Sequence, residues 1–294
     1  MNKQRLTIFF FFDKDGIVDR YINNLLESMQ KVSDKIVIVA NGILSPEGKE
    51  LFSKYSKDII IRENIGFDVW AYKTALEYID WDKLREYYEV VLMNYTIMGP
   101  VFPLIEMFNK MDQRSDLDFW GITKCFELKN PVAQEMWNCP YGYIPEHIQS
   151  SFMVYRNKFM QSKDIEKYWT NMPPINSYYE AGGIHEQVFT KYFNDLGYIW
   201  DCYTNFDNIN KSDSGCCPLI TDPIEIVINR KSPFFKRRTF FTSKSEYHNI
   251  RPIYNEFIQE LKSLGYDTDL IYETLIRTCN QRILVDNFLN FHLI

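Results

Sequence analysis

The first part of the chain alternates between two patterns of apolar and polar positions. Runs of consecutive apolar residues are typical of strands covered on both faces, and they occur at 6–12, 35–40, 58–61 and 89–93. The segments between them predict helices, the first with apolar residues at three- and four-residue spacing, at 17–29, 46–55, 69–79 and 103–111. Strands and helices in this order favour a largely parallel sheet with right-handed crossovers.

The later part of the chain extends this pattern. Two further strands are predicted at 118–123 and 147–155, and the loop between them is long enough to act as a lid. Further helices are predicted at 184–196, 250–264 and 269–291.

Length and composition suit one large domain with an appendage. The chain has 294 residues, of which 46% are hydrophobic and 24% charged, so it can bury a sizeable core. We therefore predict an α/β fold with a Rossmann-type, mostly parallel sheet flanked by helices over residues 1–225. A basic segment and a C-terminal helical extension, residues 226–294, are expected to pack on it.

Charge and cysteine content restrict the class of protein. The net charge of -6 argues against a general nucleic-acid binder, because affinity for phosphate backbones needs a basic face. The cysteines include no C-x-x-C pair and no histidine at zinc-finger spacing, which predicts reduced thiols in a cytoplasmic protein. The apolar run at 6–12 lacks a cleavage site, and no run approaches the roughly 18 residues of a membrane span.

Residues 62–73 carry a dense group of polar residues at a predicted strand end. A turn at Gly66 follows the strand, and Asp68 is expected to cap the helix at 69–79. At the carboxyl edge of a parallel sheet such a turn offers N–H groups and polar side chains to a nucleotide, although turn and cap roles alone also favour these residue types. The candidate binding residues are Arg62, Asn64, Gly66, Asp68 and Lys73.

Other polar residues follow predicted strands at the same edge. Asp13 follows the first strand, and Asn94 and Thr96 follow the fourth, so these ends are expected to line one cleft. On the helix at 184–196, His185 falls within the apolar arc and is expected in the core. Glu186 falls at the border of that arc and can face the cleft.

A local basic patch contrasts with the acidic chain. Residues 229–241 place five basic residues among four phenylalanines. The segment is either a solvated loop or a contact for an anionic ligand or a membrane surface. Its basic residues are Arg230, Lys231, Lys236, Arg237 and Arg238.

Several common chemistries lack their motifs here. No G-x-G-x-x-G follows the first strand, and neither a Walker motif nor a G-x-S-x-G elbow is present. The sheet edge is instead rich in residues that hydrogen-bond to sugars and nucleotides or stack on them. Sugar transfer is therefore the leading candidate.

A set of short motifs is distributed along the chain: Asn64-Ile-Gly-Phe-Asp68, Ala71-Tyr-Lys73, Gly99-Pro100, Phe119-Trp-Gly-Ile-Thr123, His147-Ile-Gln-Ser150 and Pro233-Phe-Phe-Lys-Arg-Arg238. Together they resemble the rhamnan synthesis protein F family, from about residue 6 to 285. The resemblance implies a GT-A glycosyltransferase that builds rhamnose-containing bacterial cell-wall and capsular polysaccharides. It also implies a nucleotide-sugar donor, such as dTDP-rhamnose or a UDP-sugar, and a polysaccharide or lipid-linked glycan acceptor.

Two positions depart from the pattern of the family. Tyr95 stands where an acidic metal ligand is expected, so dependence on a divalent metal stays open. Ser151 replaces an aromatic residue that usually follows the Gln-Ser pair. Asp116 and Asp118 have D-x-D spacing but precede a strand, and we interpret that spacing as coincidence.

Inverting sugar transfer needs a carboxylate that deprotonates the acceptor and positive groups that stabilise the leaving diphosphate. Glu186, at a helix start, is the expected base, with Glu180 and Asp118 as reserves. Without a metal, Lys73, Arg62 or the basic patch would serve the diphosphate. Residues expected on the sugar and acceptor side are Trp120, His147, Gln149 and Ser150.

Other readings of the chain remain open. A catalytically inactive scaffold or regulatory protein of polysaccharide assembly would keep the fold without the metal ligand, and a nucleotide-sugar hydrolase is a third alternative. A monomer and a homodimer are both compatible with the sequence. The expected location is cytoplasmic, with peripheral contact at the inner face of the membrane as a variant.

Overall fold

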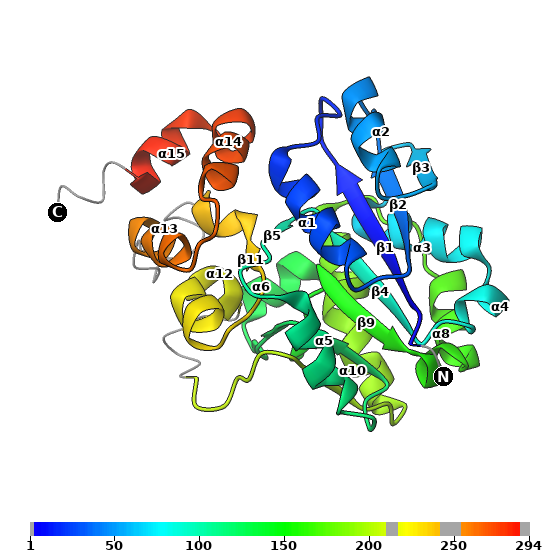
Figure 1. Ribbon diagram of the computed structural model, residues 1–294. Helices are drawn as coiled ribbons and strands as arrows, with labels where there is room; N and C mark the ends of the chain where they lie inside the picture. Colours follow the sequence, from blue (N-terminus) through cyan, green and yellow to red (C-terminus); the bar gives the residue numbers. More distant parts are fainter. Residues whose placement is uncertain (1–2, 210–216, 242–253, 289–294) are drawn as a thin grey trace.

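The computed structural model describes residues 3–209, 217–241 and 254–288 (Figure 1). Its centre is a seven-stranded sheet in the order β10-β6-β9-β4-β1-β2-β3. The strands are β1 (Arg5–Phe12), β2 (Lys35–Asn41), β3 (Asp58–Arg62), β4 (Glu89–Asn94), β6 (Phe119–Gly121), β9 (Phe152–Arg156) and β10 (Trp200–Cys202). Strand β9 is antiparallel to both of its neighbours, and the other pairings are parallel. The predicted α/β class with a mostly parallel sheet is confirmed.

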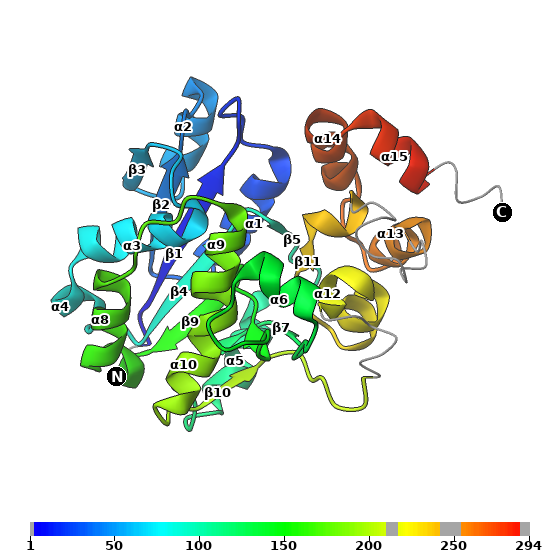
Figure 2. The ribbon, with the colours of Figure 1, turned by 180° about the vertical axis from the view of Figure 1, so that it is seen from behind.

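Helices cover both faces of the sheet, as the apolar strands require. One face carries α1 (Arg20–Gln30) and α5 (Leu104–Asp112) (Figure 1), and the other carries α3 (Phe67–Ile79), α8 (Lys163–Thr170) and α10 (Gln187–Asp195) (Figure 2). Alternate residues of β1 belong to two separate core clusters: Phe9 and Phe11 to one, Ile8 and Phe10 to the other. This double burial explains why the strand is apolar at every position.

Smaller elements connect these layers. Helix α2 follows β2, and α4 follows α3. Helix α7 follows β9, and α9 follows α8. Their bounds are α2 (Pro46–Ser53), α4 (Trp81–Leu84), α7 (Asn157–Met160) and α9 (Tyr178–Glu180). A π-helix, η1 (Ala181–Glu186), joins α9 to α10, so the predicted helix at 184–196 is α-helical only from Gln187.

The predicted strand at 147–155 is divided. Residues 149–151 interrupt it, because β8 (His147–Ile148) leaves the main sheet and pairs with β7 (Lys124–Cys125). The loop predicted between residues 124 and 146 therefore contains β7 and also α6 (Pro131–Trp137). Strand β10 at the edge of the sheet was not predicted, because a strand of three residues is too short to show a pattern of apolar and polar positions.

The C-terminal part packs against the layers that surround the main sheet. Its elements are α12 (Pro218–Thr221), η2 (Ile224–Asn229), β11 (Phe235–Lys236), η3 (Arg237–Phe240), α13 (Tyr254–Ser263), α14 (Asp269–Thr278) and α15 (Gln281–Phe288). Strand β11 pairs with β5 (Ile97–Met98), and Phe235 shares a core cluster with Phe9. The extension predicted as one helix at 269–291 is two helices, and its last residues lie outside the described part. The first residues of the helix predicted at 250–264 also lie outside it.

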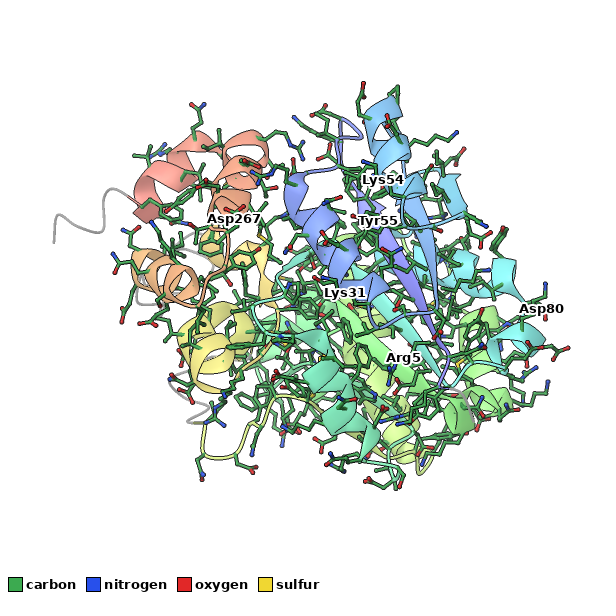
Figure 3. All side chains as sticks on the ribbon, in the orientation of Figure 1. Arg5, Lys31, Lys54, Tyr55, Asp80 and Asp267 are labelled. Atoms are coloured by element: carbon green, nitrogen blue, oxygen red, sulfur yellow. A yellow bond between two sulfur atoms is a disulfide. The ribbon has the colours of Figure 1, made fainter. Side chains whose placement is uncertain are left out.

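Helix α14 fixes the extension to the carboxyl end of β1. The Arg277 guanidinium donates to Asp13 at 2.7 Å and to Asp19 at 2.8 Å. Arg20 on α1 pairs with Asp267, which Figure 3 places on the loop before α14. These ion pairs hold the extension beside the edge where the predicted site lies.

The opposite edge of the sheet holds a buried ionic network. Arg5 and Arg156 both bind the fully buried Glu89, and both also bind Asp112 (Figure 3 labels Arg5). Charges at this depth are tolerated because each has an opposite partner. We therefore interpret this network as structural. Within the described ranges, no helix has the length and apolar character needed to cross a bilayer.

Candidate functional site

Two carboxylates meet at the carboxyl edge of the sheet. The Ser150 hydroxyl donates to Glu186 Oε2 at 2.6 Å and lies 3.5 Å from Asp68 Oδ2. The Ser150 N–H also donates to Glu186, at 2.9 Å. On the other side, Asn94 Nδ2 donates to Asp68 Oδ2 at 3.0 Å. Three predicted site residues from separate elements, Asp68, Asn94 and Glu186, are thus joined through Ser150.

The direction of the strands explains this meeting. Strand β4 ends at Asn94, and the antiparallel β9 begins at the same edge, two residues after Ser150. The backbone N–H of Asn94 donates to the carbonyl of Ser151 at 3.1 Å, which locks the two ends together. Asp68 was expected to cap α3, but the helix begins at Phe67, two residues earlier than predicted, and Gly66 takes the cap position. The Asp68 side chain is therefore free to point toward Asn94.

Glu186 is presented by the π-helix η1. Such helices are rare, and they occur frequently at functional sites. Gly182 and Gly183 form its interior and pack directly against Trp137 at the end of α6. A Cβ atom at Gly183 would lie 1.9 Å from the Trp137 carbonyl oxygen. Only glycine allows α6 to approach the helix that carries Glu186.

The Gly183→Ala variant is expected to be less stable than the parent protein. The added methyl meets a backbone oxygen that cannot rotate away, and overpacking of this kind costs about 1–3 kcal/mol. We expect a fall in melting temperature of about 2–4 °C per kcal/mol, measured by differential scanning calorimetry. An unchanged melting temperature would show that α6 can move away from η1 without loss.

The two carboxylates have different acidities. Burial and the charge of Glu186 raise the pKa of Asp68 to about 6, and the Asn94 hydrogen bond and Lys236 offset only part of this. Burial opposes the charge on Glu186 too, but His147, Lys236 and the hydrogen bonds from Ser150 outweigh it and lower its pKa. Paired groups with divergent pKa values are a common property of acid–base sites. Glu186 is therefore ionised at neutral pH.

Asp68→Asn is expected to stabilise the fold near neutral pH. The folded protein holds a proton on Asp68 more tightly than the unfolded chain does, so ionised Asp68 opposes folding above about pH 6. Asparagine removes this charge, and we expect a gain of about 1 kcal/mol, or about 2–4 °C, near pH 7.5 after allowance for solvent screening. The gain should shrink as the pH falls below about 6 and be nearly lost at pH 3.5, below the ordinary pKa of 3.8, where Asp68 is protonated in the folded and the unfolded protein alike. A gain of equal size at both pH values in thermal melts would contradict this account.

A basic face lies opposite the carboxylates. Lys236 on β11 donates to Thr96 Oγ1 at 3.3 Å, and Asp68 and Glu186 both favour its charged form. Burial outweighs them and lowers the pKa of Lys236. The next residue, Arg237, lies over the Tyr95 ring at 5.2 Å from its centre. Lys236 and Arg237 thus flank the end of β4.

The donor set at this edge does not fit a divalent metal. In the described part of the chain, no three His, Cys, Asp or Glu side chains gather closely enough to hold a metal ion. Asn94 Oδ1 is engaged by the Thr96 N–H and hydroxyl, at 3.0 and 2.6 Å, and the Lys236 ammonium adds a positive charge beside the two carboxylates. Hard divalent cations prefer several oxygen ligands and no neighbouring cation.

The turn after β3 is organised by Asn41, which the sequence did not single out. Its amide donates to the Phe67 carbonyl at 3.3 Å and lies 3.5 Å from Asn64 Oδ1, and its oxygen accepts from Arg62 at 2.8 Å. Gly66 and Phe67 both have positive φ values, 73° and 54°. A phenylalanine in this conformation is strained, and such strain is often found at functional sites. Asn41 could have been found as the last residue of a strand at this edge.

Asp13 lies at the same edge but is already engaged. It accepts from the N–H groups of Asp15 and Ile17 and from Arg277. Burial disfavours the charge on Asp13, yet these hydrogen bonds lower its pKa overall. Arg277 lies beyond the region where sequence motifs pointed to a site, so its role could not be read from the sequence.

Several predicted site residues lie elsewhere. Lys73 donates to Glu77 and to the carbonyls of Trp169 and Thr170, which ties α3 to α8. Trp120 is fully buried in the core and donates to Glu89, so it is not on the sugar side.

Asp118 precedes β6 at the opposite edge, where it accepts from the Ile199 N–H. Arg230 binds Glu225, while Lys231 is exposed. Neither joins the basic face at Lys236. Three of the four interleaved phenylalanines are fully buried, so they are unavailable to a membrane surface: Phe234, Phe235 and Phe240.

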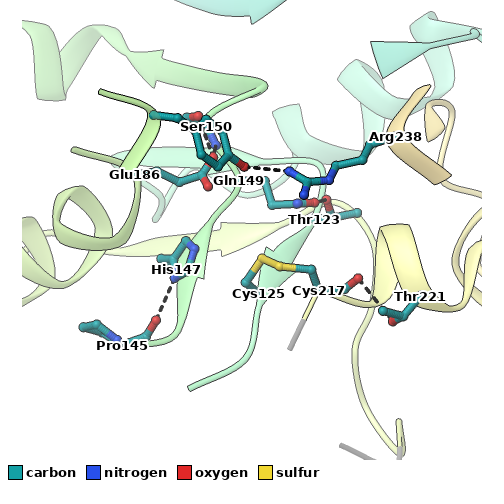
Figure 4. Close-up of a disulfide and its surroundings, with 11 residues drawn as sticks. Thr123, Cys125, Pro145, His147, Gln149, Ser150, Glu186, Cys217, Thr221 and Arg238 are labelled. Atoms are coloured by element: carbon teal, nitrogen blue, oxygen red, sulfur yellow. Dashed lines mark hydrogen bonds between the residues drawn. A yellow bond between two sulfur atoms is a disulfide. The ribbon is translucent and has the colours of Figure 1, made fainter. Parts of the chain in front are cut away.

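The β7–β8 hairpin lies beside Glu186 (Figure 4). Gln149 accepts from the Thr123 hydroxyl at 2.8 Å, and His147 Nδ1 lies 2.7 Å from the Pro145 carbonyl. Both side chains are buried. His147 acts on the site through its influence on Glu186, and Arg238 points toward Gln149 from the facing segment. His185 is buried as predicted, beside the Tyr168 hydroxyl at 3.0 Å, and burial lowers its pKa to about 4.

A disulfide joins Cys125 of this hairpin to Cys217 (Figure 4). The expectation of reduced thiols was wrong for this pair, because the fold brings together two cysteines that lie 92 residues apart. Cys139, Cys202 and Cys279 are free, and Cys216 lies outside the described residues.

Comparisons with known proteins bear on the family and the general fold. The sequence profile of rhamnan synthesis protein F matches residues 36–293. No curated protein sequence matches the chain. Glucosyl-3-phosphoglycerate synthase from Mycobacterium tuberculosis, in complex with Mg²⁺ and uridine diphosphate, is 10% identical over 68% of this chain and 69% of that chain, with a TM-score of 0.40.

Two further solved structures are similar at the same level. A cytidylyltransferase from Leptospira borgpetersenii is 12% identical over 71% of this chain and 78% of that chain, with a TM-score of 0.37. Core-mannan synthase A from Aspergillus fumigatus, in its Mn/GDP form, is 10% identical over 57% of this chain and 63% of that chain, with a TM-score of 0.30.

Proposed function

The chain belongs to the rhamnan synthesis protein F family, and from this membership and the geometry of the sheet edge we propose that it is a glycosyltransferase. It would transfer a sugar from a nucleotide donor to a growing polysaccharide, and the sugar that we propose is rhamnose. The observation that carries the proposal is the carboxylate pair Asp68–Glu186 facing Lys236 across the end of β4. Sugar transfer needs these two kinds of charge at one place.

Glu186 is the proposed general base. It removes the proton of an acceptor hydroxyl while that oxygen attacks the anomeric carbon of the donor. As the new bond forms, the bond from this carbon to the diphosphate breaks, and the electron pair leaves with the nucleoside diphosphate. Attack from the side opposite the leaving group inverts the anomeric centre.

Lys236 is the proposed partner of the leaving diphosphate, with Arg237 beside it. A preorganised positive charge stabilises the negative charge that develops on the departing oxygen. Asp68 and Asn94 would orient the donor sugar, and Ser150 would hold Glu186 in place.

The turn after β3 is the proposed nucleotide contact. Asn41, Asn64 and Gly66 lie at the start of α3, whose first N–H groups and dipole favour a negatively charged group. The exposed ring of Phe67 lies at the same turn.

The proposal is tested by ligand binding followed by product analysis. We expect one nucleoside diphosphate among UDP, dTDP and GDP to stabilise the protein by about 2.7 kcal/mol at a hundredfold excess over its Kd, seen as a rise in melting temperature. Mass spectrometry should then detect sugar transfer from the matching donor to a rhamnose oligosaccharide. Binding of no nucleotide would refute the proposal.

Transfer is expected to continue in the presence of EDTA. Because Lys236 already supplies positive charge beside the carboxylates, the leaving group has a cation that chelation cannot remove. Initial rates should be the same with excess EDTA, with Mg²⁺ and with Mn²⁺. A rate that EDTA abolishes and Mn²⁺ restores would show that a metal binds in spite of the poor donor set.

A non-catalytic scaffold is the second candidate, favoured by Tyr95 at the position of the expected acidic ligand. A scaffold would bind a nucleotide without releasing product. It would also leave polymer output unchanged when Glu186 is replaced.

A further inference from the structure

An exposed aromatic cluster lies beside the carboxylate pair and was not singled out by the sequence. Trp137, the last residue of α6, contacts Tyr178 and Tyr179 of α9, with ring centres 5.3 and 5.2 Å away. The two tyrosine rings are 5.8 Å apart. Half of Tyr178 and 46% of Tyr179 are exposed. We call these three residues the aromatic platform.

The platform is built into the element that presents Glu186. Helix α9 continues directly into η1, which ends on Glu186, and the two glycines of η1 pack against Trp137. The Tyr178 hydroxyl accepts from Arg238 at 2.9 Å. Burial raises the pKa of Tyr178, the Arg238 guanidinium opposes this shift, and the charges of Glu186 and Asp68 add to it. The platform and the base therefore belong to successive turns of one helical segment.

The chemistry of this surface suits a sugar ring better than an aliphatic protein side chain. Aromatic rings offer apolar faces to the C–H groups of a pyranose, and exposed aromatic rings that cluster together often mark a binding surface. Around the rings stand polar groups that can bind hydroxyls: the Arg238 guanidinium, the tyrosine hydroxyls and the carboxylates. Convergent polar groups around an apolar floor are typical of small-ligand sites.

We propose that the aromatic platform of Trp137, Tyr178 and Tyr179 is the acceptor subsite, which stacks the terminal ring of a rhamnose-containing glycan so that one hydroxyl reaches Glu186. This inference rests on the proposed function. It assigns donor and acceptor to opposite sides of the carboxylate pair. The donor contacts are at Lys236, Arg237 and the turn after β3, and the acceptor contacts are on α6 and α9.

The test measures saccharide and nucleotide binding separately. A short linear oligosaccharide of rhamnose is titrated into the wild-type protein and the Tyr179→Ala variant, and melting temperatures are recorded with UDP and dTDP. We expect Tyr179→Ala to weaken saccharide binding at least about tenfold, equivalent to about 1.4 kcal/mol, and to leave the nucleotide-induced shift unchanged. Trp137→Phe, which keeps a ring against the glycines of η1, should weaken binding less.

The control is Tyr78→Ala. Tyr78 is 56% exposed and binds Asp58 at the opposite edge of the sheet, so its loss should not change saccharide affinity. Full saccharide affinity in a folded Tyr179→Ala protein would overturn the subsite, as would a wild-type protein that binds nucleotide but not the oligosaccharide. Failure to bind either ligand would refute the proposed function as well.

Discussion

Glu186→Gln is expected to lower kcat by about 10²- to 10⁴-fold, the usual contribution of a general base. Glutamine keeps the size of the side chain and an oxygen that can accept both hydrogen bonds from Ser150. It cannot take a proton from the acceptor. The loss should therefore fall on kcat, while the affinity for donor and acceptor changes little. Initial rates at saturating donor, with varied acceptor, separate the two effects.

Glu180→Gln is the matched control for this experiment. Glu180 lies six positions earlier in the chain, at the end of α9, and accepts from the Asn176 N–H at 2.7 Å, outside the carboxylate pair. The same chemical change there should leave kcat within about twofold, because no acid–base role is lost. Equal activity of wild-type protein and Glu186→Gln would point to a base elsewhere at this edge, of which Asp68 is the nearest candidate. Nucleotide binding without product in both proteins would favour a scaffold.

The strands and the functional edge were predictable from local pattern. An apolar strand such as β1 is buried on both faces, between two helical layers. The helices that connect successive strands make those strands parallel. Their carboxyl ends then share an edge, so Asp68 and Asn94 could be expected close together. The antiparallel β9 adds Ser150 to this edge because its beginning, rather than its end, lies there.

Features that depend on tertiary packing could not be predicted in the same way. A tryptophan such as Trp120 can stack on a sugar or pack in a core. Here the packing of α5 against the sheet buries it. The π-helix depends on the contact between Gly183 and Trp137, residues from different elements. Lys73 and Lys236 are equally basic in the sequence. The first is used to join two helices, and the second reaches the carboxylates because β11 pairs with β5.

Lys236→Met is expected to lower kcat by about 10²- to 10³-fold. Methionine fills a similar volume but carries no charge, so the leaving diphosphate loses its nearest cation, a change comparable with loss of one oxyanion donor. Lys231→Met is the matched control, since Lys231 is exposed in the same basic segment. Lys236→Arg should retain more activity than Lys236→Met, because arginine keeps the positive charge. It should be less active than wild-type protein, because the planar guanidinium differs in shape from the ammonium group.

The Lys236→Met variant also has a pH signature that a merely structural residue would not produce. Lys236 lowers the pKa of both Asp68 and Glu186, so its removal should raise both values. Protonated Glu186 cannot act as base, and the acidic limb of the profile of kcat against pH should therefore move to higher pH. Lys231→Met should leave the limb in place. If Lys236→Met lowers the rate equally at every pH, Lys236 does not share an electrostatic site with the carboxylates, and its role is structural.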